Sequence, residues 1–218
     1  LNEKVYALGC EIYGEKHPST IRALSNLATT YRGLEEFEKE LELGEKACAL
    51  KCEVLGEEHQ DTLLSLNNVA MAHYDLKNYE KAAELLEKAY KTQCRTIGKN
   101  QPDALISLNN LALVYVTLGN HEKGLELAEK AYTSRCDVLG EKHPCTLLSL
   151  NNVALAHFRL KNYKKAAELW EKVCVAKDEV FGEKHPDSLT FANNLACAYD
   201  KLGQPEKAAE IRARASEN

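Results

Sequence analysis

Three nearly identical segments of the chain carry two adjacent asparagines inside an otherwise apolar run. They read SLNNVAMAHYDL at 65–76, SLNNLALVYVTL at 107–118 and SLNNVALAHFRL at 149–160. A side-chain carboxamide offers two hydrogen-bond donors and an acceptor, so it can pair with both the N–H and the C=O of an extended peptide, whatever the peptide's sequence. We therefore expect the paired amides to bind the backbone of another polypeptide.

Cysteine is the next residue type that could do chemistry, since the chain has eight. Cys10, Cys52, Cys94 and Cys136 recur 42 residues apart. A disulfide needs Cα atoms about 4.4–6.8 Å apart, whereas packed helices are separated by roughly 8–10 Å. We therefore expect no disulfide ladder. Free thiols in this number favour a reducing compartment, hence the cytoplasm.

Six of the seven histidines fall into two groups. His17, His59, His143 and His185 belong to a recurring phrase of the type GEKHP, and Gln101 stands in its place once. This tolerance favours a role at a helix entry or in packing over metal binding. The second group, His73 and His157, shares its repeat position with tyrosines, which favours helix packing.

Composition and missing motifs narrow the function further. The net charge is −5, with 28 basic and 33 acidic residues, which disfavours a nucleic-acid platform. No apolar run approaches the ~20 residues that cross a bilayer. We find no phosphate-binding loop and no nucleophile elbow. The sequence therefore predicts that the chain is not an enzyme and binds no cofactor. We expect its partner to be a protein or peptide, and neither a nucleic acid nor a membrane.

A fixed period organises the whole chain. Gly14, Gly56, Gly98, Gly140 and Gly182 are each 42 residues apart, and an asparagine follows each of them after the same interval. We predict a single array over residues 1–218. Its parts are the end of a preceding helix at 1–14, repeats at 17–56, 59–98, 101–140 and 143–182, and a final helix pair at 185–217. Residues 1–14 match 85–98, the later part of a second helix, so the chain starts in the middle of a repeat and we expect a fragment of a longer protein.

One repeat reads as two helices. Residues 62–76 carry apolar side chains at a spacing of three to four, as does 79–97, whose other side is rich in Glu and Lys. The short segment 76–78 connects them. Proline at the start of the first helix costs no hydrogen bond, and Gly98 follows the second helix where a left-handed residue is expected.

Small residues set how the two helices pack. Ala82, Gly124, Ala166 and Ala208 share one position of the second helix, where a small side chain lets helix axes approach to roughly 8–10 Å. Two amphipathic helices cannot bury their faces alone, so each pair must stack on the next. The sequence thus predicts an all-α protein, an α-solenoid of stacked antiparallel helix pairs.

The repeat resembles the tetratricopeptide repeat in the order and spacing of Val69, His73, Ala82, Leu86 and Ala89. The 42-residue period, the LGEKHP phrase and the paired asparagines are similar to those of the kinesin light chain subclass. The resemblance implies a right-handed superhelix and an adaptor role, and related repeats hold peptides with asparagines in this position.

The chain departs from that pattern at both ends. In the first full repeat Glu40 replaces the small residue, and Gly44 replaces a bulky one. In the last repeat Pro205 and Arg212 occupy packing positions, so its second helix is expected to be an irregular cap.

In such an array the first helices line the concave wall, which predicts the binding site. We expect an extended peptide or short linear motif to lie in this groove, with the asparagines facing inward and apolar residues beside them selecting side chains. The predicted groove residues are Asn26, Asn67, Asn68, Asn109, Asn110, Asn151, Asn152, Asn194, Leu64, Met71, Tyr74, Ile106, Leu113, Leu148, Leu155, Phe158 and Arg159.

Other interpretations of the same pattern stay open. The first asparagine of each pair, at 67, 109, 151 and 193, could equally bond between neighbouring helices and set the superhelical pitch. The second, at 68, 110 and 152, is favoured for ligand contact. The array could also be a self-assembly element that forms a homo-oligomer, or a regulatory module of a larger signalling enzyme.

Overall fold

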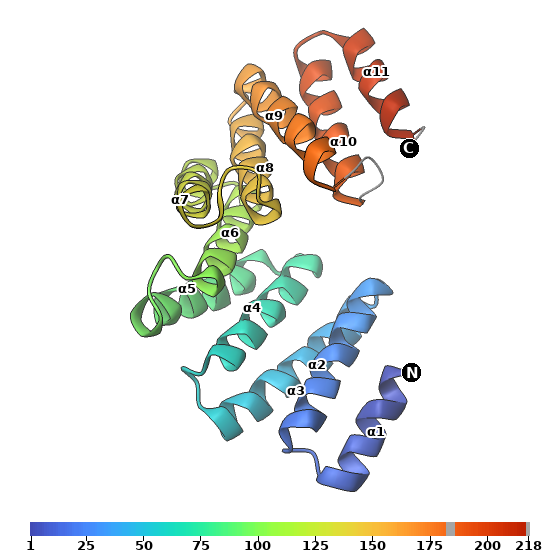
Figure 1. The fold of residues 1–218 in the computed structure, drawn as a ribbon, viewed down its shortest axis with the longest axis vertical. Helices are drawn as coiled ribbons and strands as arrows, with labels where there is room; N and C mark the ends of the chain where they lie inside the picture. The colour runs from blue at the N-terminus through green and yellow to red at the C-terminus, as the bar shows by residue number, and fades with distance from the viewer. Residues whose placement is uncertain (182–185, 217–218) are drawn as a thin grey trace. The chain divides into compact units, whose positions relative to one another are not determined.

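The computed structural model describes the backbone of residues 1–181 and 186–216, and the side chains of 1–176 and 189–215. Within these residues the chain forms eleven α-helices and no strand (Figure 1). The helices are α1 (Asn2–Tyr13), α2 (Pro18–Gly33), α3 (Phe37–Leu55), α4 (Gln60–Asp75), α5 (Tyr79–Thr96), α6 (Pro102–Thr117), α7 (His121–Leu139), α8 (Pro144–Arg159), α9 (Tyr163–Phe181), α10 (Pro186–Lys201) and α11 (Pro205–Ser216). The predicted all-α class is confirmed, and α11 is a regular helix.

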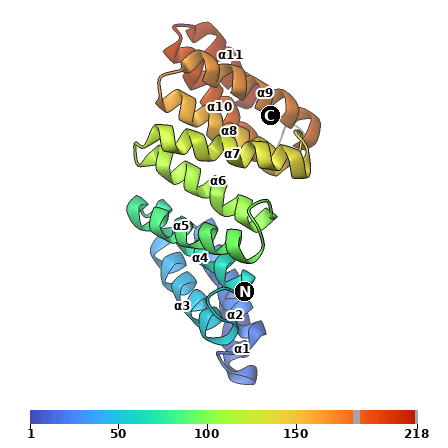
Figure 2. The same cartoon turned by 90° about the vertical axis from the view of Figure 1, so that its left-hand side faces the viewer.

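The chain divides into two compact units, Leu1–Asn110 and Leu111–Asn218, with the boundary inside α6. In the first unit, consecutive helices from α1 to α5 pack against one another. In the second unit α7 to α11 do the same, and α8 also contacts α10 (Figure 2). The predicted stacking of helix pairs is therefore confirmed. We call α2, α4, α6, α8 and α10 the first helices of their repeats, and the others the second helices.

Histidine begins three of the first helices. His17, His59 and His143 are the N-cap residues of α2, α4 and α8, and each Nδ1 accepts the backbone N–H two positions later at 3.1–3.2 Å. This bond satisfies one of the N–H groups that a helix start leaves without a partner. The predicted helix-entry role is confirmed for these three; His185 lies outside the described residues.

Glycine ends the second helices, but with a different backbone than expected. The positive φ predicted for Gly98 is confirmed, at 98°. Gly14, Gly56 and Gly140, which follow α1, α3 and α7, likewise have φ of 84°, 95° and 88°. Their ψ values of 162°, 159° and 158° are extended instead of left-handed helical. This region is essentially open to glycine alone, and it carries the chain directly toward the next N-cap. Gly182 lies outside the described residues.

The predicted small position of the second helix is buried in every repeat that has a small residue there: Ala82, Gly124, Ala166 and Ala208. At Gly124 a Cβ would lie 2.5 Å from Val116 Cγ2 and 2.9 Å from the Val116 backbone nitrogen. Backbone cannot yield as a flexible side chain can, so α7 approaches Val116 as closely as glycine allows.

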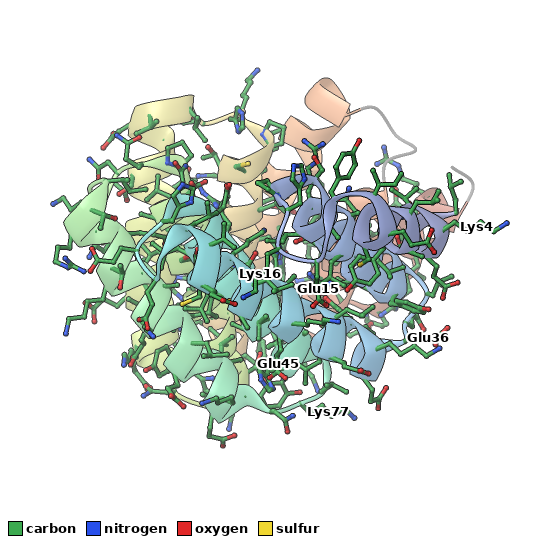
Figure 3. The ribbon with its side chains drawn as sticks, turned by 90° about the horizontal axis from the view of Figure 1, so that it is seen from below. Lys4, Glu15, Lys16, Glu36, Glu45 and Lys77 are labelled. Atoms are coloured by element: carbon green, nitrogen blue, oxygen red, sulfur yellow. The ribbon has the colours of Figure 1, made fainter. Side chains whose placement is uncertain are left out.

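Charged side chains project from the first unit, among them the labelled Lys4, Glu15, Lys16, Glu36, Glu45 and Lys77 (Figure 3). Glu15 and Lys16, in the α1–α2 connection, form ion pairs with Lys46 and Glu53 of α3. All four are exposed, and exposed pairs of this kind contribute at most about 1 kcal/mol each. The packing of successive helices must therefore be stabilised mainly by buried contacts.

We expect Gly124→Ala to destabilise the protein by about 1–3 kcal/mol, because the added methyl overpacks the helix crossing. Gly33→Ala is the control: Gly33 is also helical, but nothing lies within 4 Å of the position that its Cβ would take. Thermal unfolding followed by circular dichroism should show a lower Tm for Gly124→Ala only, by roughly 2–4 °C per kcal/mol. An unchanged or higher Tm would contradict the close approach.

Candidate functional site

The paired asparagines of the first unit bond between successive first helices. Asn110 of α6 donates from Nδ2 to Asn67 Oδ1 of α4 at 3.2 Å. Asn67 is buried, with 4% exposure, while Asn110 is half-buried. The bond therefore sits at the edge of the packed interior and ties one repeat to the next.

The second unit repeats this bond. Asn194 of α10 donates from Nδ2 to Asn151 Oδ1 of α8 at 3.3 Å. The same oxygen accepts the indole N–H of Trp170 at 2.8 Å. Trp170 is 1% exposed and belongs to the main core cluster of this unit, so its N–H has no access to solvent. Asn151 therefore satisfies a buried donor as well as linking two repeats.

An amide between neighbouring helices is the structural alternative that the sequence left open. For Asn67 and Asn151, the first member of each pair, this alternative is what the structure shows. For Asn110 and Asn194, the second member, one N–H is used in the same way, although ligand contact was favoured for Asn110 and Asn194 was placed among the groove residues. A half-buried carboxamide that uses one N–H in this way still has its oxygen and its second N–H to hydrogen-bond with a ligand.

The remaining groove residues divide by burial. Asn109, Asn152 and Met71 are buried. Asn26, Asn68 and Arg159 are exposed, and so is Asn193, which precedes the bonded Asn194. The other apolar groove residues are exposed or half-buried: Leu64, Tyr74, Ile106, Leu113, Leu148, Leu155 and Phe158. Tyr74 and Phe158 each pack on the first tyrosine of the following helix, with ring centroids 5.3 and 5.2 Å apart.

Contacts between successive first helices obey one offset. Both amide bonds join residues 43 apart, one more than the 42-residue period. Arg32 of α2 pairs with Asp75 of α4 at 2.9 Å with the same offset, and Gln60 of α4 bonds to Asp103 of α6 likewise. A residue on one flank of a first helix therefore faces the residue one position further along on the next.

Contacts from a second helix to the following first helix obey two further offsets. At 14 residues, Lys51 donates to Ser65 at 2.7 Å and Arg135 donates to Ser149 at 2.8 Å. Burial lowers the pKa of both basic groups. Gln93 and Ser107 occupy the equivalent buried positions, and neither side chain hydrogen-bonds within the described residues.

At an offset of 28 residues a glutamate faces an alternating tyrosine or histidine. Glu3 accepts the Tyr31 hydroxyl and Glu171 accepts that of Tyr199. The Glu171 bond, aided by burial, raises the pKa of Tyr199 to about 12. His73 Nε2 lies 3.6 Å from Glu45 Oε1 in the equivalent arrangement. At this position, where the sequence predicts helix packing, the side chain makes a polar contact with a glutamate of the preceding repeat.

His157 holds the same position in α8. Its Nδ1 is buried and has no hydrogen-bond partner in the part of the chain that the structure describes. Burial lowers the pKa of His157 and Lys165 lowers it further, while Glu129 opposes them. Folding therefore makes protonation of the His157 imidazole less favourable than it is in the unfolded chain.

A pocket opens between α2, α3 and α4 of the first unit, with a volume of about 190 Å³. We call it the α2–α4 pocket. It is lined by Ser25, Ala28, Thr29, Arg32, Glu40, Gly44, Ala47, Asn68, Val69 and Ala72. Ser25, Thr29 and Arg32 occupy the repeat positions equivalent to the predicted groove residues Asn67, Met71 and Tyr74, and Asn68 is itself one of the predicted groove residues.

Three departures from the repeat pattern line this pocket. Ser25 stands where later repeats have the first asparagine, so Asn68, 43 residues on, has no amide to meet and stays exposed. Gly44 replaces the larger residue found in α5, α7 and α9, and a Cβ there would make only an ordinary contact, 3.5 Å from Val69. Glu40 replaces the small residue of the other second helices.

The Glu40 carboxylate is the pocket's unusual chemical group. Glu40 is 5% exposed, and its Oε2 accepts no hydrogen bond within the described residues. Arg32 Nε lies 3.8 Å from Oε1, too far for a good hydrogen bond, and its Nη2 is engaged by Asp75. Burial raises the pKa of Glu40, Arg32 opposes this, and Asp75 adds to it.

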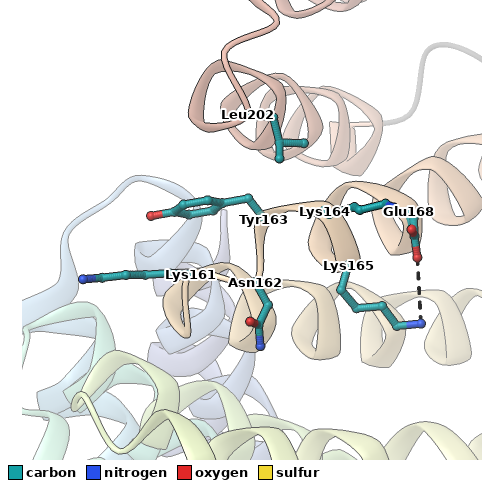
Figure 4. Close-up of a pocket in the computed structure, with 7 residues that line it drawn as sticks. All are labelled: Lys161, Asn162, Tyr163, Lys164, Lys165, Glu168 and Leu202. Carbon is teal, nitrogen blue, oxygen red and sulfur yellow. Dashed lines mark ion pairs between the residues drawn. The ribbon is translucent and has the colours of Figure 1, made fainter.

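A second concavity lies in the other unit (Figure 4). It has a volume of about 490 Å³ and is lined by Lys161, Asn162, Tyr163, Lys164, Lys165, Glu168 and Leu202, at the start of α9 and the end of α10. Lys165 and Glu168 form an ion pair across 4.0 Å. None of the predicted groove residues lines it, and its lysines are exposed.

The described part of the chain has neither a cluster of metal-binding side chains nor a helix that could span a membrane. No group of three or more His, Cys, Asp or Glu side chains there could hold a metal ion. The eight cysteines are free. None of the helices in residues 1–181 and 186–216 has both the length and the apolar character that a membrane span requires.

Stacked helix hairpins with a repeated packing pattern define a helical-repeat protein. Family models described as tetratricopeptide repeat match residues 20–61, 62–103, 103–174 and 189–215. Because these matches span most of its length, the chain belongs to the tetratricopeptide-repeat family. No curated protein matches it in sequence.

Solved structures share the fold. The nearly identical TPR-like repeats of a candidate kinesin light chain from Podospora anserina are 29% identical, with a TM-score of 0.72, over 92% of this chain and 95% of that one. The repeats here are accordingly kinesin light chain-like. BtubC (BKLC) from P. vanneervenii is 20% identical, with a TM-score of 0.76, over 99% and 85%. A Rap protein complexed with Competence and Sporulation Factor is 16% identical, with a TM-score of 0.80, over 92% and 54%.

We expect Asn151→Ala to destabilise the protein by about 1–3 kcal/mol, because it leaves the buried Trp170 N–H without an acceptor. Asn193→Ala is the matched control, since Asn193 is also helical but exposed, and its effect should stay within about 0.5 kcal/mol. Urea unfolding of both variants measures the difference. Equal stabilities would contradict a structural role for the Asn151 amide.

The lowered pKa of His157 predicts a pH dependence. Unfolding lets the imidazole bind a proton near its ordinary pKa of about 6.5, whereas the folded state resists protonation until lower pH. The His157 contribution to stability is therefore complete above about pH 6.5 and is lost as pH falls through the folded pKa. His157→Tyr, which installs the residue of Tyr115 and Tyr199, should flatten the fall in urea-unfolding stability between pH 7.5 and 5.5. A slope equal to that of the unmodified chain would refute this assignment.

Proposed function

We propose that this chain is a protein-interaction module that holds an extended segment of a partner protein against its first helices. Side-chain amides bind the partner's backbone, and adjacent apolar residues select its side chains. The observation that carries the proposal is the α2–α4 pocket. Four of its lining residues stand at predicted inward positions: Ser25, Thr29, Arg32 and Asn68.

The amides that support this function are those with unused hydrogen-bonding capacity. Asn26 and Asn68 are exposed, and no hydrogen bond of either side chain is present in the described residues. Asn110 and Asn194 are half-buried and each spends one N–H on the preceding first helix. Asn67 is excluded from direct contact by its burial, so we assign it to positioning Asn110.

Apolar residues beside the amides would supply selectivity. Leu148 and Leu189 are large exposed apolar side chains on α8 and α10 of the second unit. On α4 and α6 of the first unit, Leu64 and Ile106 are half-buried. When a partner covers partly exposed leucine and isoleucine side chains, the burial contributes about 25 cal/mol of binding free energy per Å² of apolar surface removed from water.

Proteins of the same fold support this mode of action. The Rap protein described above was solved with Competence and Sporulation Factor, and a second Rap protein, of 14% identity and TM-score 0.75, with a Phr* peptide. At this identity only the fold carries over, so the identity of the ligand does not. We propose binding without catalysis, and a cytoplasmic location because of the free cysteines.

The test starts from peptides selected by the full chain from a random display library. Asn68→Ala and Asn26→Ala should each weaken the tightest selected peptide by about 1–3 kcal/mol, roughly 5- to 150-fold, as measured by fluorescence polarisation. Ser25→Asn should weaken it too, since the new amide can pair with Asn68 across the 43-residue offset.

Asn100→Ala is the matched control, because Asn100 is an exposed amide between α5 and α6, away from the inward positions. It should leave affinity unchanged. Thermal melting confirms that each variant is folded. Folded Asn26 and Asn68 variants that bind every selected peptide as tightly as the parent chain would reject the proposed function.

A further inference from the structure

Counted together with Asp75, which binds Arg32 but does not itself line the cavity, the α2–α4 pocket carries an excess of negative charge. Arg32 is the only cationic side chain among its lining residues, and Arg32 lies between two carboxylates, with Asp75 at 2.9 Å and Glu40 at 3.8 Å. One guanidinium and two carboxylates leave one negative charge without a counterpart. Because Asp75 makes the close contact with Arg32, the uncompensated charge falls on Glu40.

Glu40 is also short of hydrogen bonds. Its side chain is 7% exposed, and its Oε2 has no donor within the described residues. Leaving a buried carboxylate oxygen unsatisfied is costly unless a partner arrives to pair with it. The four other second helices that span this position have alanine or glycine there, so nothing in the repeat's packing requires an acid.

The rest of the pocket is shaped for an aliphatic chain. Ala28, Ala47 and Val69 form apolar walls, and Gly44 leaves open the space that Leu86 fills in α5. The polar side chains of Ser25, Thr29 and Asn68 come from the predicted inward face. A ligand entering past them would place methylene groups on the apolar wall before it reached Glu40.

We propose that the α2–α4 pocket binds a primary ammonium group on an aliphatic stem, which in a protein partner is a lysine side chain, and pairs it with the Glu40 carboxylate. Lysine combines an apolar four-carbon stem with a compact charge and three donors. This inference rests on the proposed function, since the bound segment brings the lysine to the pocket and Asn68 beside the pocket holds that segment's backbone.

The direct test uses small probes and so does not depend on any selected peptide. N-acetyl-lysine N-methylamide is titrated into the ¹⁵N-labelled full chain at pH 7, and its norleucine counterpart provides the same stem without the charge. The lysine probe should shift the backbone amides of residues 25–32, 40–47 and 68–72 saturably, and should bind at least tenfold more tightly than the norleucine probe. No saturable shift, or equal affinities, would overturn the proposal.

Variants of α3 locate the charge. Glu40→Gln should abolish the tenfold preference for lysine, while Glu42→Gln, which changes an exposed glutamate of the same helix, should retain it. Glu40→Ala installs the residue that α5 and α9 carry, so it provides a folded variant should Glu40→Gln unfold. Gly44→Leu should block both probes by filling the pocket. Retention of the lysine preference in Glu40→Gln or Glu40→Ala would contradict the assignment.

The outcomes separate this inference from the function on which it rests. Selected peptides that depend on Asn68 but show no preference for lysine in Glu40-containing protein would reject only the lysine pocket. Lysine-probe binding without any Asn68-dependent peptide would reject the proposed function while leaving the ammonium site itself in place.

Discussion

Within the first unit, α4 contacts a first helix on each side, α2 through Asp75 and α6 through Asn67, and both contacts join residues 43 apart, one more than the 42-residue period. Successive residues of an α-helix point roughly 100° apart, since 3.6 residues make a turn. Two adjacent side chains can therefore reach toward opposite neighbours, one to the preceding first helix and one to the following. Asn110 reaches back to Asn67, and Asn194 reaches back to Asn151. A single asparagine could not serve both directions, which explains why the asparagines come in pairs.

The same offset explains where an amide is left over. Asn68 points back toward position 25, where the chain has serine, and the Ser25 hydroxyl is used by its own helix through the Ile21 carbonyl. Asn68 therefore remains exposed at the mouth of the α2–α4 pocket. Glu40 and Gly44, two further departures in the same repeat, form the opposite wall. Departures from the repeat pattern are thus concentrated at a pocket that adjoins the predicted groove positions in the first unit. Since the proline and alanine positions around them follow the pattern, the fold is maintained while the local chemistry changes.

Much of the fold follows from the sequence because it depends on local and repeated signals. The helix bounds, the histidine N-caps and the buried small residues at Ala82 and Gly124 follow from periodicity and steric size. The ψ of the terminating glycines was not predictable, because it depends on the direction in which the chain must leave the helix. Which asparagine of a pair is buried depends on the flank that faces the next helix, a property of packing and not of the repeat itself.

The hydrogen bond between Glu171 and Tyr199 could have been found from the sequence, since glutamate recurs every 42 residues opposite tyrosine or histidine. The pocket could be anticipated only in part: Glu40 and Gly44 were visible as departures, but their effect required the Arg32 and Asp75 geometry.

The asparagine side chains divide into those that link repeats and those that stay available to a partner, and the proposed function depends on this division. Hydrogen exchange of the side-chain NH₂ groups, measured by NMR on the free chain, tests it with no ligand and no substitution. We expect one proton of the Asn110 and Asn194 amides to be protected, while the Asn26, Asn68 and Asn193 amides exchange as fast as those of an unfolded peptide. Equal exchange at all five amides, or protection of Asn68 in the free chain, would contradict the division.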